Sequence, residues 1–165
     1  MTVLVADVFA PEKRSWLMGR VRNTGTAPEL ELRRALRRIG LRGWRSQLRT
    51  PSGTPDIAFP AERVAVYVDG AFWHGHPSKF RFGKSGAFWD AKVGRNIARD
   101  RQERARLRRD GWSVLRVWDF EALRTPERAA ERIRRKVLMR SGVRLVGVPA
   151  SLMTPHARTS RLGRT

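Results

Sequence analysis

An apolar run, Val64–Val68, ends abruptly in an acid, a glycine, two aromatic residues and a histidine, and this junction constrains the fold most. Short β-branched runs bounded by turn residues are typical of buried strands. A second run, Ile57–Phe59, precedes it across the turn Pro60–Arg63, which predicts two neighbouring strands. Asp56 opens the first strand and Asp69 follows the second, so we expect both carboxylates at one edge of a sheet.

Helical periodicity on both sides of these strands predicts a layered fold. Thr26 and Glu29 have the spacing of a capping box, so a helix is expected to begin there. The predicted helices are Thr26–Gly40, Phe88–Arg109 and Pro126–Met139, and further strands are predicted at Trp44–Leu48 and Ser113–Trp118. The resulting order αβββαβα describes an α/β protein with a mixed central sheet flanked by helices.

The length of 165 residues suits one domain that buries its own core. We expect residues 1–150 to form this single domain. A basic segment near its start, Glu12–Arg22, has the composition of a short helix or ordered arm. Residues 151–165 carry several arginines and no acidic residue, so we expect a disordered basic C-terminal tail.

The chain is strongly basic: lysine and arginine number 35 against 15 acidic residues, a formal net charge of +20. Such an excess indicates a polyanionic partner, above all nucleic acid. An arginine-biased genome or attraction to anionic lipid are the alternative explanations. The sequence has no cysteine, which excludes disulfides and thiolate zinc sites, and no apolar run near the roughly 20 residues of a membrane span. We therefore expect a soluble, cytoplasmic protein.

Paired carboxylates at one sheet edge suit magnesium-dependent cleavage of phosphodiesters. Mg²⁺ prefers oxygen ligands, and a bound divalent ion activates water and stabilises the leaving oxygen. Asp56 and Asp69 are therefore candidate catalytic acids. The alternative is structural: Asp56 caps a turn, and Asp69 begins one in which Gly70 is left-handed.

The motif after the strand adds an imidazole and two aromatic side chains. His74 suits a general base, while the competing interpretations are a surface histidine or a metal pair with His76. These two histidines are too few for a closed zinc site. Phe72 and Trp73 are either core residues or a wedge that enters a DNA duplex.

Two further acids have roles that the residues alone leave open. Asp100 shares a helix face with Lys92 and Asn96, and it could orient a histidine. Its alternative role is an ion pair with Arg104 one turn later. Glu29 is already accounted for by its capping box.

Five ordered blocks between Lys13 and Leu123 resemble the very short patch repair (Vsr) endonucleases. The blocks are Asn23–Arg33, Gly53–Ile57, Val66–Gly75, Phe88-Trp89 followed by Asn96 and Arg99-Asp100, and Gly111–Trp118. Phe-Trp-His after Asp-Gly is the most distinctive of these motifs.

This resemblance implies a restriction-endonuclease-like core that nicks double-stranded DNA 5′ to the thymine of a T·G mismatch, which arises when 5-methylcytosine deaminates. It implies that Asp56 binds Mg²⁺ and that the carbonyl of Val68 offers a second ligand. His74 would be the catalytic histidine, with Asp100 and Glu29 as supporting acids. We expect the protein to act as a monomer.

The resemblance also assigns Met18, Phe72 and Trp73 to an intercalating wedge. Asp69 occupies a position where some family members have histidine, so a catalytic role for Asp69 is an expectation that the family pattern leaves open.

The sequence departs from the family at two places. Family members commonly hold a structural zinc with cysteines, but Ala71 and Phe120 stand at corresponding positions here. We therefore expect no structural zinc, with apolar packing in its place. Thr54 stands where an arginine is frequent, which changes the expected local contacts with DNA.

Two other functions are consistent with the same residues. One is a sequence-specific restriction or defence nuclease of the same fold. The other is a non-catalytic basic DNA-binding protein in which the acids are structural.

Overall fold

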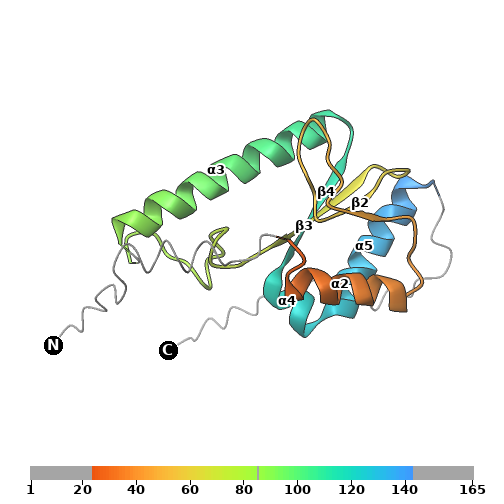
Figure 1. Ribbon diagram of the computed structural model, residues 1–165, viewed down its shortest axis with the longest axis horizontal. Helices are drawn as coiled ribbons and strands as arrows, with labels where there is room; N and C mark the ends of the chain where they lie inside the picture. Colours follow the sequence, from red (N-terminus) through yellow and green to blue (C-terminus); the bar gives the residue numbers. More distant parts are fainter. Residues whose placement is uncertain (1–23, 85, 143–165) are drawn as a thin grey trace, which may run out of the picture.

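The computed structural model describes residues 24–84 and 86–142, which form a four-stranded mixed sheet flanked by helices (Figure 1). The predicted α/β, restriction-endonuclease-like class is therefore confirmed. The strands are β1 (Arg45–Ser46), β2 (Ile57–Phe59), β3 (Val64–Asp69) and β4 (Ser113–Trp118), and the helices are α2 (Ala27–Arg38), α3 (Ala87–Arg109), α4 (Asp119–Arg124) and α5 (Pro126–Arg140). The predicted arm at Glu12–Arg22, Met18 within it, and the tail at 151–165 lie outside the described residues.

The order of the strands explains why the acids meet. β2 pairs antiparallel with β3, which brings the start of β2 beside the end of β3, and Ile57 lies opposite Val66. β3 pairs parallel with β4, so the carboxyl ends of both strands reach the same edge, where Asp69 lies opposite Trp118. Asp56, directly before β2, therefore lies at the edge where β3 and β4 end.

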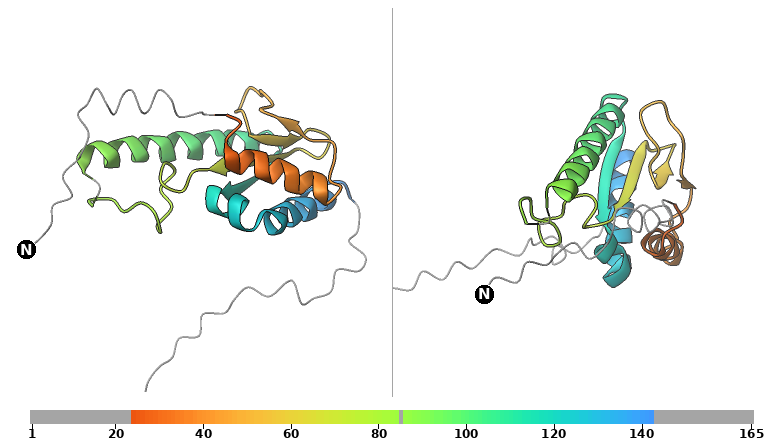
Figure 2. Two further views of the ribbon diagram at one scale, coloured as in Figure 1. Left: turned by 60° about the horizontal axis from the view of Figure 1, so that its bottom comes forward. Right: turned by 60° about the vertical axis from the view of Figure 1, so that its left-hand side comes forward.

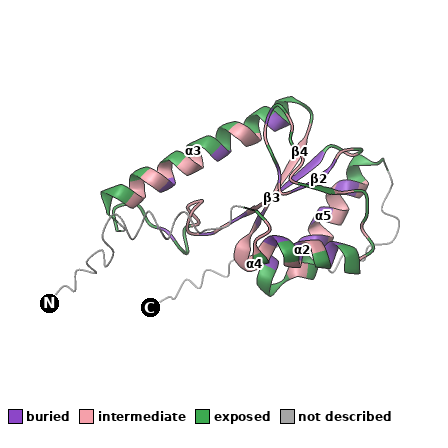
Figure 3. Ribbon diagram, in the orientation of Figure 1, coloured by how far each residue is buried: buried purple, intermediate pink, exposed green. Residues whose placement is uncertain are grey.

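The main core lies between the sheet and the helices α2, α4 and α5. Apolar positions of α2 and α5 recur on one face of each helix, and Leu32, Leu36 and Ile133 are fully buried against strand residues that include Ile57 and Val66. Full burial of a leucine or isoleucine side chain is worth about 1.5–3 kcal/mol. Figure 3 shows this buried layer between the helices and the strands, with most of α3 exposed or half-buried.

Helix α3 lies apart from the three core helices and extends beyond the sheet (Figure 2). It contacts β4, and Val93 and Leu107 are among its few fully buried side chains. None of the helices in the described residues is long and apolar enough to span a bilayer. The position of α3 brings the middle of a long polar helix to the sheet edge that carries Asp56 and Asp69.

Two elements differ from the prediction. β1 has two residues instead of five because Gln47, next in the chain, has a left-handed φ of 51° that ends the strand. Helix α4 was not predicted, because it follows β4 without a glycine or proline between them. Its start is stabilised by Glu121, whose carboxylate accepts a 2.9 Å hydrogen bond from the backbone N–H of Trp118.

Candidate active site

A cavity of about 620 Å³ opens where the ends of β3 and β4 meet α2 and the middle of α3. Of the predicted site residues, Glu29, Asp56, Val68, Asp69, Trp73, His74 and Asp100 line it. Phe72 does not line it, and Met18 lies outside the described residues. Segments that are far apart in the chain thus bring five acids, the four predicted ones and Asp119, and one imidazole to a single pocket.

Asp56 is held at the pocket by hydrogen bonds to both carboxylate oxygens. Gln47 Nε2 donates to Oδ1 at 2.9 Å, and the backbone N–H of Val68 donates to Oδ2 at 2.7 Å. Burial raises the pKa of Asp56 to about 6, and the charges of Glu29 and Asp69 add to the increase although both hydrogen bonds oppose it. Negative charge at this position is therefore unfavourable unless a cation compensates it.

The donors around Asp56 fit a magnesium ion that is bound mainly by water and substrate. Mg²⁺ commonly takes one or two carboxylates and completes its coordination with waters and phosphates. A half-buried carboxylate whose pKa is raised first by burial and then by neighbouring acids is a suitable ligand, because the ion would compensate the charge. Within residues 24–84 and 86–142, no cluster of three or more His, Asp or Glu side chains forms a complete protein cage for a metal.

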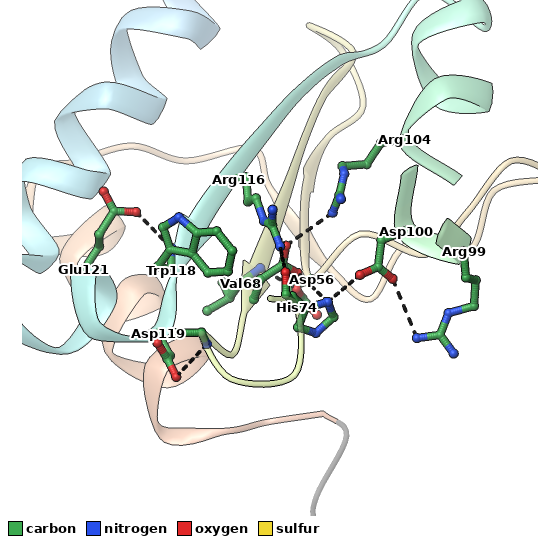
Figure 4. Close-up of polar contacts among 12 residues, drawn as sticks. Asp56, Val68, His74, Arg99, Asp100, Arg104, Arg116, Trp118, Asp119 and Glu121 are labelled. Carbon is green, nitrogen blue, oxygen red and sulfur yellow. Dashed lines mark hydrogen bonds and ion pairs between the residues drawn. The ribbon is translucent and has the colours of Figure 1, made fainter. Parts of the chain in front are cut away.

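His74 is fixed by its backbone and by its ring. Its N–H donates to the carbonyl of Gly70 at 3.1 Å, and its ring Nδ1 makes a short hydrogen bond with Asp100 Oδ2 (Figure 4). An ionised carboxylate can only accept, so Nδ1 carries the proton, and in the neutral ring Nε2 keeps a free lone pair. The pair of His74 and Asp100 therefore has the arrangement of a general base and its orienting acid.

Asp100 is ionised because of its neighbours. Burial alone would raise the pKa of Asp100, but the hydrogen bond from His74 and the charges of His74, Arg104 and Arg99 lower it below its ordinary value. Arg99 Nη2 lies 3.6 Å from Oδ1. The expected alternative, an ion pair between Asp100 and Arg104, is absent from the contacts of the described residues because Arg104 turns to Asp69.

Asp69 is paired with two arginines from different elements. Arg104 Nη1 of α3 lies 3.2 Å from Oδ2, and Arg116 Nε of β4 makes a short ion pair with the same oxygen. Arg116 also donates from Nη2 to the carbonyl of His74 at 3.2 Å, and its guanidinium lies 3.7 Å from the centre of the Trp118 ring. Asp69 is buried, and this network joins it to the backbone of His74.

Glu29 makes its predicted capping contacts and also lies at the pocket. One carboxylate oxygen accepts from the Thr26 hydroxyl at 2.8 Å, and the other accepts from the backbone N–H of Gly25 at 3.0 Å. Arg33 Nη2 lies 3.3 Å away on the same helix. The side chain stabilises the start of α2 and at the same time lines the pocket beside Asp56.

Phe72 and Trp73 belong to an aromatic cluster next to the pocket. The two rings pack edge to face at 5.0 Å, and each lies less than 6 Å from the ring of Trp89 on α3. Lys92 Nζ lies 5.6 Å from the Trp73 ring centre. The cluster is half-buried. Trp89 of α3 packs against both rings, and Trp73 lines the pocket.

His76 is turned away from the pocket and packs among aromatic side chains. Its ring lies edge to face with Trp118 at 4.6 Å and with Phe120 at 5.2 Å. Its Nδ1 accepts a 3.2 Å hydrogen bond from the backbone N–H of Ser78. Ala71 beside it is buried. These residues do not fit a structural zinc, because Nδ1 is already an acceptor and the neighbouring side chains offer no ligand.

Several site residues could not be assigned from the sequence. Gln47 contacts Asp56, and Arg116 contacts Asp69, only because of the way in which the strands pair. An arginine inside the apolar strand Ser113–Trp118 was the one available signal, since a buried arginine needs an acid. The sequence identifies Lys92 and Asn96 only as neighbours of Asp100 on one helix face.

A mixed sheet with acids and an Asp–His pair at one edge, in a chain of net charge +20, is the arrangement expected of a nuclease of restriction-endonuclease-like fold. The family model described as DNA mismatch endonuclease Vsr matches residues 6–79. Relatives that are at least a third identical extend this similarity over most of the chain. The chain therefore belongs to the Vsr family of DNA mismatch endonucleases, and it is a DNA endonuclease.

Three relatives illustrate the range of the family. The chain is 38% identical over 140 residues to the type II nicking enzyme V.NmeDIP of Neisseria meningitidis serogroup C, which covers 83% of this chain and 94% of the relative. It is 43% identical over 116 residues to the type II nicking enzyme V.NaeI of Lentzea aerocolonigenes, covering 67% and 69% of the two chains. DNA mismatch endonuclease Vsr of Escherichia coli strain K12 is 35% identical over 129 residues, covering 77% and 81%.

Proposed function

We propose that this endonuclease nicks duplex DNA 5′ to the thymine of a T·G mismatch and that it uses magnesium. Membership of the Vsr family supports this reaction, and several relatives are named as nicking enzymes. The observation that carries the proposal is the single pocket in which Asp56 and the His74–Asp100 pair lie together.

Asp56 and the carbonyl of Val68 would hold the ion, and Glu29 would add negative charge beside them. A divalent ion bound there stabilises charge that develops on the scissile phosphate and the leaving oxygen. The raised pKa of Asp56, caused first by burial and then by Glu29 and Asp69, supports its role as a cation ligand. Gln47 and the N–H of Val68 keep the Asp56 carboxylate in one orientation.

His74 would act as the general base. Its free Nε2 accepts a proton from the attacking water, and Asp100 stabilises the resulting imidazolium through Nδ1–H. Asp69 is then a positioning residue: it holds Arg116, which in turn holds the carbonyl of His74. This role agrees with a carboxylate already paired with two guanidinium groups.

Trp73, Phe72 and Met18 would form the wedge that opens the duplex at the mismatch. Aromatic side chains that enter a base step unstack it, at a cost of a few kcal/mol that is smaller at a mispaired step. The packing of Trp89 against Trp73 and Phe72 agrees with this role, because a wedge must keep its position when it enters a base step. One chain supplies every residue named here, so we propose that the protein acts as a monomer.

The second candidate is a restriction-like nuclease of matched DNA, which the type II names of several relatives favour. A plasmid assay separates the two functions. Purified protein with Mg²⁺ should convert a supercoiled plasmid that carries one T·G pair to the nicked circle, and it should leave the matched plasmid intact. Linear product from the matched plasmid would favour the restriction function. Omission of Mg²⁺, or Asp56→Ala, should abolish the nick.

A further inference from the structure

A second cavity, of about 440 Å³, lies between α4 and α5, and half of its lining residues are arginines. The guanidinium-bearing residues are Arg124 of α4 and Arg128, Arg132 and Arg135 of α5. The spacing of the last three places them on one face of α5. Ala129, Ala130, Ile133 and Val137 of the same helix are buried in the core, so the arginine face is directed outward by packing.

The positive charge of this arginine pocket is only partly compensated. Glu121 is the one acid in its wall, and it pairs with Arg132 at 3.2 Å. Within residues 24–84 and 86–142, Arg124, Arg128 and Arg135 have no carboxylate within ion-pair distance. The Nε atoms of Arg132 and Arg135 are buried and have no hydrogen-bond partner among the described residues. Buried donors of this kind need an acceptor, and beside three guanidinium groups without a carboxylate partner an anion is the acceptor that the charge favours.

The arginine pocket adjoins the active site. Asp119, the first residue of α4, lines the active-site cavity, while Phe120 and Glu121, the next two residues, line the arginine pocket. In Figure 4 the side chains of Asp119 and Glu121 point in different directions from the start of α4. The two cavities therefore lie on either side of one helical turn.

We infer that the arginine pocket binds a backbone phosphate of the same DNA duplex that enters the active site. Phosphates recur about every 3.4 Å of helix axis along each strand, so a duplex in the first cavity presents phosphates to the second. Guanidinium groups bind phosphate through paired N–H donors, which suits the unused donors of Arg132 and Arg135. This contact depends on the enzyme being a DNA endonuclease, not on its specificity for a mismatch.

The first test is the salt dependence of DNA binding. The full-length double variant Arg128→Gln/Arg135→Gln would be compared with wild type in metal-free buffer, where the proposed metal dependence predicts no cleavage. Each lost phosphate contact should reduce the slope of log K against log salt by about 1, equally on matched and T·G duplexes. Arg132 is left intact because it also donates to the carbonyl of Arg116.

The matched control is Arg108→Gln/Arg109→Gln, which removes the same charge from an exposed turn at the end of α3. Thermal unfolding must show that both double variants remain folded. If the two variants have the same slope, the arginine pocket makes no specific phosphate contact and the inference fails. An acidic protein partner would produce this result.

A phosphate scan locates the contact. Single neutral methylphosphonate linkages would be placed along each strand of the duplex. At one or two positions the substitution should weaken binding of wild type and not of Arg128→Gln/Arg135→Gln, because the two changes remove the same interaction. Equal losses for both proteins at every position would overturn the inference. Neither result bears on the position of the nick, so the proposed reaction is tested separately.

Discussion

At the scale of single residues, we expect the charge state of Asp56 to affect the stability of the enzyme. Burial and two neighbouring acids raise the pKa of this carboxyl to about 6. At neutral pH the ionised Asp56 carboxylate is therefore unfavourable until a cation or a proton neutralises it. An unfavourable charge that is kept for function lowers the stability of the enzyme when no metal is bound.

Stability should reflect this charge. A carboxyl whose pKa is higher in the folded than in the unfolded state loses folded stability as the pH rises from about 4 to about 6. Asp56→Asn removes the charge, so without metal it should raise the free energy of unfolding at pH 7 by up to about 2 kcal/mol. The gain should shrink toward pH 4. Denaturant unfolding at both pH values checks this, and an equal change at both would contradict it.

The His74–Asp100 pair makes a prediction for catalysis. His74→Ala should lower kcat by about 10²- to 10⁴-fold, because a general base is lost. Asp100→Asn should also lower kcat, because an amide can donate to Nδ1 and favour the tautomer whose Nε2 cannot accept a proton. Single-turnover nicking and DNA affinity should be measured together. Unchanged kcat in either variant, or a loss explained wholly by affinity, would refute these roles.

At the scale of elements, the contact between the His74 loop and α3 is close. Gly75 has a φ of +68°, and a Cβ atom there would lie 2.5 Å from Ile97 Cδ1 of α3. Gly83 has a similar φ of +78° with nothing within 4 Å of an added Cβ. Alanine at Gly83 would therefore introduce backbone strain alone, whereas alanine at Gly75 would introduce both backbone strain and crowding.

Alanine at both glycines tests this contact. Gly83→Ala should cost about 1–2 kcal/mol of stability through strain alone. Gly75→Ala should cost more and should also slow nicking, because crowding by Ile97 displaces the residue next to His74. Thermal unfolding and kcat would be compared for both variants. If Gly75→Ala behaves like Gly83→Ala in both measurements, the loop is not held by α3.

The elements also show what a sequence can reveal. β2 and β4 have the predicted bounds, because short apolar runs between turn residues define a strand locally. The shortening of β1 depends on the left-handed Gln47, whose side chain donates to Asp56 from the facing strand. Sequence patterns predict which acids reach the sheet edge, whereas their partners depend on register and on the position of α3. That is why Arg104 was expected beside Asp100 but pairs with Asp69.

At the scale of the whole molecule, we predict that side-chain packing around His76 takes the place of the structural zinc that the family resemblance implies. His76, Trp118, Phe120 and Ala71 fill this region among the described residues. Elemental analysis of the purified protein should find no stoichiometric zinc. A zinc chelator should leave the midpoint of thermal unfolding unchanged, because no folding energy depends on the metal. One zinc per chain, or a clear fall in the midpoint, would contradict this account.

The whole molecule joins a basic surface to one acidic pocket. The net charge of +20 favours DNA of any sequence, so charge alone supplies no specificity for a mismatch. We propose that Asp56, His74 and the aromatic wedge act together on one phosphodiester beside a mispaired thymine.

The most direct test is to map cleavage at single-nucleotide resolution on end-labelled T·G, G·C and A·T duplexes of otherwise identical sequence, with Mg²⁺. We expect one nick, on the thymine strand, at the phosphate 5′ to the mispaired thymine, and no cut in either matched duplex. Cleavage of all three duplexes at equal rates, or a break in both strands, would contradict it.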